Sequence, residues 1–192
     1  WFRKSVEQDF TAAKVCLALH YAMGRGIEQD HVQAFHWAQQ AAEEGHSLAQ
    51  CFLGMRYKKG LGVERDLEKA IYWYTKAAEQ GYANAQNLLG VCYYNGLGGV
   101  HNYTQAVYWY RKAAKQGFTE AYYRLGVCYL YGYGVTEDPV QANHWFTKAA
   151  EDGHAESQCN LGAAYATGNG VAPDHMKAVY WLKKAAEQGE EK

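Results

Sequence analysis

Cysteine and histidine are the residues of this chain best suited to redox or metal chemistry, but their spacing supports neither. The 192 residues include five cysteines and eight histidines. They form no CxxC pair of the kind that binds zinc or exchanges disulfides, and no HExxH motif. We therefore predict no metal site and no cofactor. The cysteines are expected to be small buried hydrophobic side chains with free thiols: Cys16, Cys51, Cys92, Cys128 and Cys159.

Nucleophiles and acid–base pairs are also scarce. None of the serines Ser5, Ser47 and Ser157 lies in a GxSxG motif. Paired carboxylates such as Glu43 and Glu44 are expected at solvated helix ends. The Gly-x-Gly pairs follow predicted helices and not strands, so they indicate helix ends instead of a phosphate-binding loop. We predict no catalytic residue and a chain that is not an enzyme.

Composition and charge exclude two further classes of function. The chain is 48% hydrophobic and 20% charged, which is enough apolar material for a sizeable core. Its formal net charge of −1 lacks the basic footprint of a nucleic-acid-binding protein. No run of 18 apolar residues occurs, so no membrane span is predicted. Free thiols favour the cytoplasm, while a periplasmic or secreted location stays open.

The elements that position these residues repeat every 36 residues. All six tryptophans keep this step: Trp1, Trp37, Trp73, Trp109, Trp145 and Trp181. A leucine, a tyrosine and an alanine recur with the same period. A fixed period of this length is typical of a solenoid of stacked supersecondary units. The tryptophans share a helical face with the repeated alanines, so we expect them in the core.

Each unit resolves into two helices. In the second unit, Leu53 and Tyr57 lie on one face of the first helix, which Gly60 ends in a left-handed conformation. Asp66 caps the second helix and Gly81 ends it. The equivalent caps are Asp30, Asn102, Asp138 and Asp174, and the equivalent stops are Gly45, Gly117, Gly153 and Gly189.

The period predicts an all-α fold of about five helix-turn-helix repeats in a single solenoid domain over residues 1–192. Each pair buries its apolar face only against its neighbours, which produces a superhelix. Because Trp1 already belongs to the pattern, we expect a fragment of a longer protein. The predicted units are a partial repeat at 1–9 and full repeats at 10–45, 46–81, 82–117, 118–153 and 154–189.

The pattern LG…Y…GLGV…D…KA…WY.KAAEQG in residues 52–81 resembles the Sel-1-like repeat, a relative of the tetratricopeptide repeat. The resemblance covers nearly the whole chain and recurs five times. It implies a right-handed α/α superhelix that serves as a scaffold for protein–protein contacts. It carries no shared catalytic residue. Such proteins act in bacterial virulence and envelope systems and in eukaryotic degradation and signalling complexes.

Some residues depart from the family pattern. Asp9 replaces the helix-stopping glycine and Ala18 replaces the glycine of Gly54, which weakens the pattern near the amino end. Gly99 stands where Val63 stands in the second unit, which indicates a looser connection. No cysteine lies on a second helix, so the interhelical disulfides of the cysteine-rich branch of the family are not expected.

By resemblance to tetratricopeptide repeats, the first helices line a concave groove that binds a partner. The variable positions of these helices are then the candidate contacts. We expect an aromatic patch of tyrosines beside asparagines, with lysines at one edge; the alternative is that these tyrosines only pack together. The predicted groove residues are Lys58, Lys59, Asn87, Tyr94, Asn95, Tyr123 and Tyr131.

These observations predict a non-catalytic scaffold that binds a protein or peptide, in a bacterial virulence, regulatory or toxin-immunity role. Two alternatives stay open: a ligand-binding protein or hydrolase of the cysteine-rich Sel-1-like type, and a structural spacer in a larger protein. The last helix, KAVYWLKKAAEQG, keeps the internal pattern instead of a polar outer face. Self-association through uncapped ends is therefore a further expectation.

Overall fold

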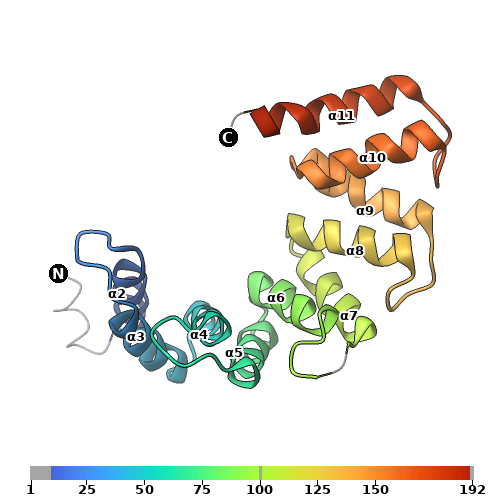
Figure 1. Cartoon of the computed structure of the whole chain (residues 1–192). Coiled ribbons are helices and arrows are strands. Elements are labelled where there is room, and N and C mark those ends of the chain that lie inside the picture. The colour runs from blue at the N-terminus through green and yellow to red at the C-terminus, as the bar shows by residue number, and fades with distance from the viewer. Residues whose placement is uncertain (1–9, 100, 191–192) are drawn as a thin grey trace. The chain divides into compact units, whose positions relative to one another are not determined.

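The structure, a computed structural model, describes residues 10–99 and 101–190, and within these ranges it contains ten helices and no strand (Figure 1). The predicted all-α repeat solenoid is confirmed, while the predicted partial repeat at 1–9 lies outside the described residues. The helices, in pairs, are α2 (Thr11–Met23) and α3 (His31–Glu43), α4 (Ser47–Lys59) and α5 (Leu67–Glu79), α6 (Ala83–Tyr94) and α7 (Tyr103–Ala114), α8 (Thr119–Tyr131) and α9 (Pro139–Glu151), and α10 (Ala155–Thr167) and α11 (His175–Glu190).

The chain divides into two compact units. The first comprises Trp1–Cys92 and Gly96–Val100, and the second comprises Tyr93–Asn95 and His101–Lys192. The division falls in the third repeat, where Gly99 departs from the pattern and α6 has 12 residues instead of the 13 of the other first helices. That all repeats form one domain remains a prediction, so each unit is described by itself.

Acidic and amide side chains start the second helices as predicted. The side chain of Asp30 accepts hydrogen bonds from the backbone N–H groups of Val32 and Gln33. Asp138 accepts them from two residues of α9, which begins with Pro139 at a position where the missing N–H costs nothing. Asp66, Asn102 and Asp174 cap the remaining second helices in the same way.

Glycines end the helices, with one exception. Gly60, at the end of α4, has φ +68°, and Gly45, after α3, has φ +93°. Both angles are left-handed and favour glycine. The predicted stop at Gly189 is wrong, because α11 runs through it to Glu190. The residue after the glycine closes the turn. After α3, for example, the backbone N–H of His46 donates to the Ala41 carbonyl at 3.1 Å, and α4 begins at the next residue.

In three of the pairs, the core is filled by the aromatic side chain that follows the tryptophan. Tyr74, Tyr110 and Phe146 are the largest fully buried side chains. Of the described tryptophans only Trp109 is buried, and the others are half-buried. The tryptophans therefore lie at the edge of the core, and the prediction that they form it is only partly right. The centre of the core in those three pairs is the residue that follows the tryptophan.

A glycine on the first helix makes room for two of these rings, those of Tyr74 and Phe146. A Cβ at Gly54 would lie 2.8 Å from the ring of Tyr74, and one at Gly126 would overlap the ring of Phe146. In the first repeat Ala18 replaces the glycine, and Ala38 stands where the ring would be; both alanines are buried. The departure at Ala18 is thus matched by a smaller partner and does not weaken the packing of that pair.

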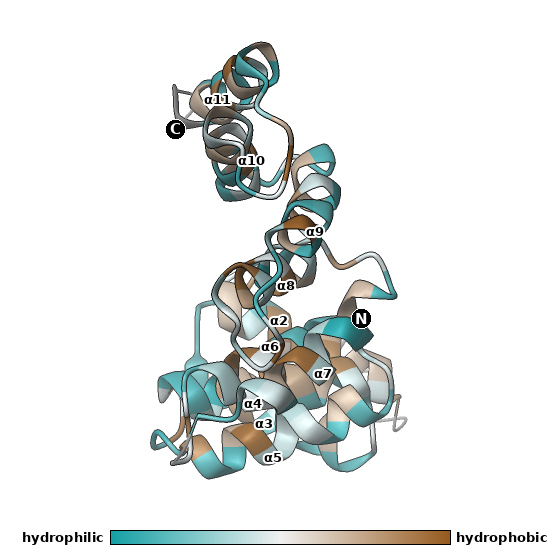
Figure 2. Ribbon diagram, turned by 90° about the vertical axis from the view of Figure 1, so that its right-hand side faces the viewer, coloured by the Kyte–Doolittle hydropathy of each residue, from teal (hydrophilic) through white to brown (hydrophobic). Residues whose placement is uncertain are grey.

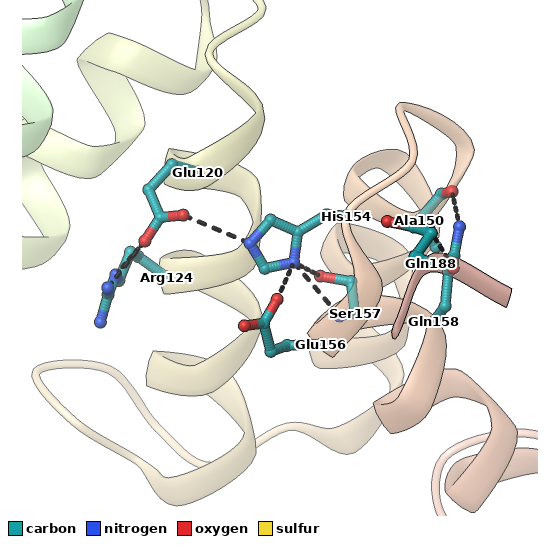
Figure 3. Close-up of polar contacts among 8 residues, drawn as sticks. All are labelled: Glu120, Arg124, Ala150, His154, Glu156, Ser157, Gln158 and Gln188. Carbon is teal, nitrogen blue, oxygen red and sulfur yellow. Dashed lines mark hydrogen bonds and ion pairs between the residues drawn. The ribbon is translucent and has the colours of Figure 1, made fainter. Parts of the chain in front are cut away.

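Consecutive repeats are joined by buried polar contacts. In the second unit, the Gln158 side chain donates to the Ala150 carbonyl at the end of α9 and accepts from Gln188 of α11 at 2.9 Å (Figure 3). In the first unit, Gln50 donates to the Ala42 carbonyl and accepts from Gln80 in the same manner.

Figure 2 shows hydrophilic and hydrophobic residues alternating along the helices, as expected where each helix buries only one face.

Candidate protein-binding face

The seven predicted groove residues are divided between the two units. Lys58, Lys59 and Asn87 lie in the first unit; Tyr94, Asn95, Tyr123 and Tyr131 lie in the second. Lys59 and Asn95 are exposed and Lys58 is half-buried. Asn87 is only 5% exposed and its Oδ1 atom has no hydrogen-bond partner, so its side chain is not on an open face.

Two of the predicted tyrosines belong to one aromatic cluster of the second unit. The ring centroid of Tyr94 lies 5.3 Å from that of Tyr103 and 5.6 Å from that of Tyr133. Tyr103 and Tyr133 stack at 4.9 Å, and Tyr131 contacts Tyr133 at 5.8 Å. We call Tyr94, Tyr103, Tyr131 and Tyr133 the tyrosine cluster. Its outer member, Tyr131, is 60% exposed.

The cluster combines rigidity with an accessible edge. The edge-to-face and stacked arrangements are the favourable geometries for aromatic pairs. Burial raises the pKa of the Tyr94 hydroxyl, with a further contribution from the neighbouring tyrosines, so the hydroxyl stays protonated further into alkaline solution than an exposed tyrosine. His101 extends the stack, with its ring 5.6 Å from Tyr103. The cluster therefore offers a preorganised aromatic surface with hydroxyl groups that can donate hydrogen bonds.

Sequence reasoning missed half of this cluster because it considered only the first helices. Tyr103 is the first residue of the second helix α7, and Tyr133 lies inside a Gly-x-Gly turn. A signal was present: Tyr133 stands where other repeats have Leu61 or Leu97, and Tyr103 stands where the second repeat has Leu67. Aromatic residues at these variable positions would have indicated that the cluster extends beyond the first helices.

Tyr123 does not join the cluster. Its ring stacks on the imidazole of His154 at a centroid distance of 4.6 Å and contacts the buried ring of Phe146 at 6.1 Å. The guanidinium carbon of Arg124 lies 5.5 Å from the same ring. Tyr123 is thus half-buried between neighbours, and the alternative of packing describes it better than an open contact.

His154 connects α10 to α8 through a polar network (Figure 3). The backbone N–H of Ser157 donates to its Nδ1 at 3.2 Å, which caps α10. Because Nδ1 accepts, the proton lies on Nε2, which donates to Glu120 at 3.2 Å. Arg124 in turn donates to Glu120 at 2.7 Å, and a Glu156 oxygen lies 3.5 Å from Nδ1.

The order serine, histidine, glutamate in this network is that of a catalytic triad, but its geometry serves the fold. The Ser157 hydroxyl lies 3.2 Å from Nδ1 of His154, the same nitrogen that accepts the backbone N–H. Ser157 is 0% exposed, so no substrate can reach its hydroxyl. The contacts fix the start of α10 against α8 and hold the imidazole on which Tyr123 stacks.

The cysteines are all free thiols, and three of them are buried as predicted. Burial raises the pKa of Cys51 and Cys128 to about 12 and that of Cys92 to about 11. The prediction is wrong for Cys159, which is exposed on α10, while Cys16 is half-buried. Within residues 10–99 and 101–190, no group of three or more His, Cys, Asp or Glu side chains could hold a metal ion.

These buried thiols predict a loss of stability in alkaline solution. Above about pH 9 the unfolded chain releases thiol protons that the folded chain retains, so the free energy of unfolding falls as pH rises. Each thiol should contribute about 1 kcal/mol per pH unit until its folded pKa is reached. Urea unfolding at pH 8, 9 and 10 measures the slope.

The matched variant for that measurement is Cys128→Ala. It should lower stability at pH 8 yet reduce the alkaline slope, most clearly between pH 8 and 9, since one of three buried thiols is removed. Burial also raises the pKa of Tyr74 and Tyr110, so these hydroxyls add to the slope near pH 10 and remain in the variant. Cys159→Ala removes an exposed thiol and should leave the slope unchanged. An equal slope in the wild type and in Cys128→Ala would contradict the assignment of the slope to buried thiols.

The fold and these contacts place the chain among the α/α helical repeat proteins. The Sel1 repeat model matches it five times, at residues 12–46, 47–82, 83–118, 119–154 and 155–190. The chain belongs to the Sel1 repeat family, and the predicted resemblance is confirmed. Sel1 repeat proteins are generally non-catalytic scaffolds that bind protein partners. No curated protein sequence matches the chain significantly.

Solved structures of bacterial relatives agree with this assignment. A protective antigen of uropathogenic Escherichia coli is 37% identical, with a TM-score of 0.95 over 98% of this chain and 40% of its own. A Sel1 repeat protein of Oxalobacter formigenes is 38% identical, with a TM-score of 0.89 over 95% of this chain and 72% of its own. An immunity protein of Pseudomonas aeruginosa shares the fold at 22% identity and a TM-score of 0.58, over 93% of this chain and 65% of its own.

The chain therefore spans about 40% of the length of the Escherichia coli protein that it resembles. In the part of the chain that the structure describes, no helix is both long and apolar enough to cross a membrane.

Proposed function

We propose that this chain is a protein-binding scaffold whose second unit holds a partner protein or peptide on the tyrosine cluster. The observation that carries the proposal is the packing of four tyrosines from α6, α7, α8 and the following turn into one cluster, with Tyr131 60% exposed at its edge. Tyrosine is enriched among the anchors of protein interfaces because it buries a large area at a small entropy cost.

Other predicted residues have secondary roles in this proposal. Asn95 is exposed directly after Tyr94 and is able to hydrogen bond to a partner's backbone. In the first unit, Lys58 and Lys59 are a separate contact for acidic groups. Tyr123 supports the surface by packing on His154 instead of touching the partner.

The finer role that we propose is that of a bacterial virulence, regulatory or toxin-immunity factor. Support comes from the descriptions of two relatives, a protective antigen of Escherichia coli and an immunity protein of Pseudomonas aeruginosa. Self-association is a further proposal, because α11 exposes the apolar side chains of Met176, Val179 and Tyr180. A ligand-binding protein and a structural spacer are the outcomes that the experiment must separate from a scaffold.

The experiment places a photo-crosslinking residue at position 131 and exposes the protein to extract of the source cells. The matched control carries the same residue at position 167, the equivalent exposed end of the first helix in the fifth repeat, where Thr167 stands. One dominant protein captured only from position 131 would support the proposal. Binding of that protein should then fall at least about tenfold in Tyr131→Ala, as for an interface anchor.

Equal capture at positions 131 and 167, or none at either, would contradict a partner on the tyrosine cluster. Thermal stabilisation by small molecules at micromolar concentration would then favour a ligand-binding protein. A chain that neither captures a protein nor responds to small molecules would favour a spacer.

A further inference from the structure

A second surface of the second unit carries residues that differ from their equivalents in other repeats. A hollow of about 360 Å³ opens between α7 and the turn that follows α8. Val107, Tyr108 and Gly134 form its apolar part, and Arg111, Lys112 and Lys115 form a basic rim. We call it the α7 hollow.

The side chain at position 107 contributes to the open space. In the second repeat, Ile71 stands where Val107 stands, and its Cδ1 would lie 2.9 Å from a Cβ at Gly98. In the fourth repeat the position is Asn143, whose side chain donates to the Asn169 carbonyl at 2.7 Å. Both side chains fill or bridge the space beside the turn. Val107 is shorter than either, so the space beside Gly134 stays open.

Arg111 and Lys115 differ in charge from their equivalents in most other repeats. The third cation of the rim is common to four repeats, as Lys76, Lys112, Lys148 and Lys184, and the fifth repeat has Lys183 where Arg111 stands. The position of Lys115 is glutamate in every other repeat: Glu43, Glu79, Glu151 and Glu187. The position of Arg111 is threonine in the second and fourth repeats, at Thr75 and Thr147. Positions that keep their residue type hold a repeat scaffold together. A reversal of charge at one repeat is therefore not required by the fold.

Two of the three cations contact neutral groups. Arg111 donates to the hydroxyl of Tyr129 at 2.8 Å, and the Lys112 ammonium lies 4.8 Å from the ring of Tyr108. Among the described residues, no carboxylate forms an ion pair with Arg111, Lys112 or Lys115. Positive charge around an apolar recess attracts a ligand that carries both an apolar group and negative charges.

We propose that the α7 hollow binds an acidic peptide segment of a partner protein. An aromatic or large aliphatic side chain enters the recess against Val107 and Tyr108, and flanking carboxylates pair with Arg111 and Lys115. A nucleic acid is the less suitable occupant, because it requires an extended basic track and the chain has a net charge of −1. The proposal does not depend on binding at the tyrosine cluster.

The test measures fluorescence anisotropy with a labelled peptide of glutamates and aspartates around one phenylalanine. Two control peptides replace either the acids by their amides or the phenylalanine by serine. The wild-type chain should bind the acidic phenylalanine peptide at least about tenfold more tightly than either control, and more weakly as salt is added. Equal binding of all three peptides would overturn the proposal.

The variants are chosen from residues that other repeats already carry, so the fold should tolerate them. Arg111→Thr with Lys115→Glu removes three charge units and should weaken binding at least about tenfold. The matched control, Lys183→Thr with Lys184→Glu, removes the same charge from exposed positions of α11 and should change binding less than about twofold. Equal losses in both variants would indicate non-specific attraction and overturn the proposal.

A charge-neutral variant tests the recess itself. Val107→Ile restores the side chain of the second repeat and fills the hollow without changing any charge. It should weaken binding of the acidic phenylalanine peptide and leave binding of a single-stranded oligonucleotide unchanged. Unaltered peptide binding in Val107→Ile, or an oligonucleotide that binds as tightly as the peptide, would identify a general polyanion surface and reject the peptide site.

Discussion

Replacing Phe146 by alanine is expected to lower the free energy of unfolding by about 3–5 kcal/mol, the cost of emptying a well-packed aromatic site. Phe146 is 1% exposed and belongs to a core cluster with Ala142, Ala150 and Leu161. Its ring occupies the space that Gly126 leaves on the facing helix. Gly126 has no side chain that could move into the vacated space, so a cavity should remain around a smaller residue.

Trp145→Ala is the matched control, because it removes a larger aromatic side chain one position away. Trp145 is half-buried and stacks on Tyr122 at a centroid distance of 5.8 Å. The Lys148 ammonium lies 5.2 Å from the centre of its ring. Its removal should cost about 1–3 kcal/mol, because much of the site is open to water. Urea unfolding followed by circular dichroism measures both. A larger cost at Trp145 than at Phe146 would contradict the assignment of the core.

These neighbours show what the repeat pattern can and cannot predict. Helix starts at Asp66 or Asp138 and helix ends at Gly60 follow from local chemistry, so the sequence predicts them well. The choice between two adjacent aromatics depends on a rotation of about 100° about the helix axis, which the spacing of Trp residues does not resolve. The informative signal was the pairing of Gly126 with a ring and of Ala18 with Ala38.

The candidate site was less predictable because tertiary contacts build it. Tyr94 and Tyr131 follow from first-helix spacing, and the structure places both in one cluster. Tyr103 and Tyr133 join them through a turn whose position depends on close packing against the neighbouring helix. Asn87 was expected on the open face but is buried. Its position is at the border between the packed and the open side of α6, where the exposure of a side chain depends on how closely the neighbouring helices pack.

Gly62→Ala should destabilise the first unit by roughly 3 kcal/mol or more, although it adds only one methyl group. Gly62 has φ +77°, and an added Cβ would overlap the carbonyl oxygen of His31 at the start of the preceding second helix. Two costs therefore combine: the strain of a left-handed alanine and a clash with backbone that cannot rotate away as a side chain can.

Gly45→Ala separates the two costs. Gly45 has φ +93°, and nothing lies within 4 Å of an added Cβ. It should therefore show the strain alone, about 1–3 kcal/mol. Urea unfolding of both variants gives the difference, which measures how closely the turn approaches the preceding repeat. Equal costs in Gly45→Ala and Gly62→Ala would show that the turn relaxes freely and that the contact between repeats is not tight.

The same contact recurs in the second unit, where it bears on binding. A Cβ at Gly134 would overlap the backbone of Tyr103, a member of the tyrosine cluster, and Gly134 itself lines the α7 hollow. Gly134→Ala should therefore destabilise the repeat as Gly62→Ala does and also displace both surfaces. Stability in a solenoid is the sum of repeat and interface terms, so a single glycine turn couples the packing of consecutive repeats to the residues of both proposed binding surfaces.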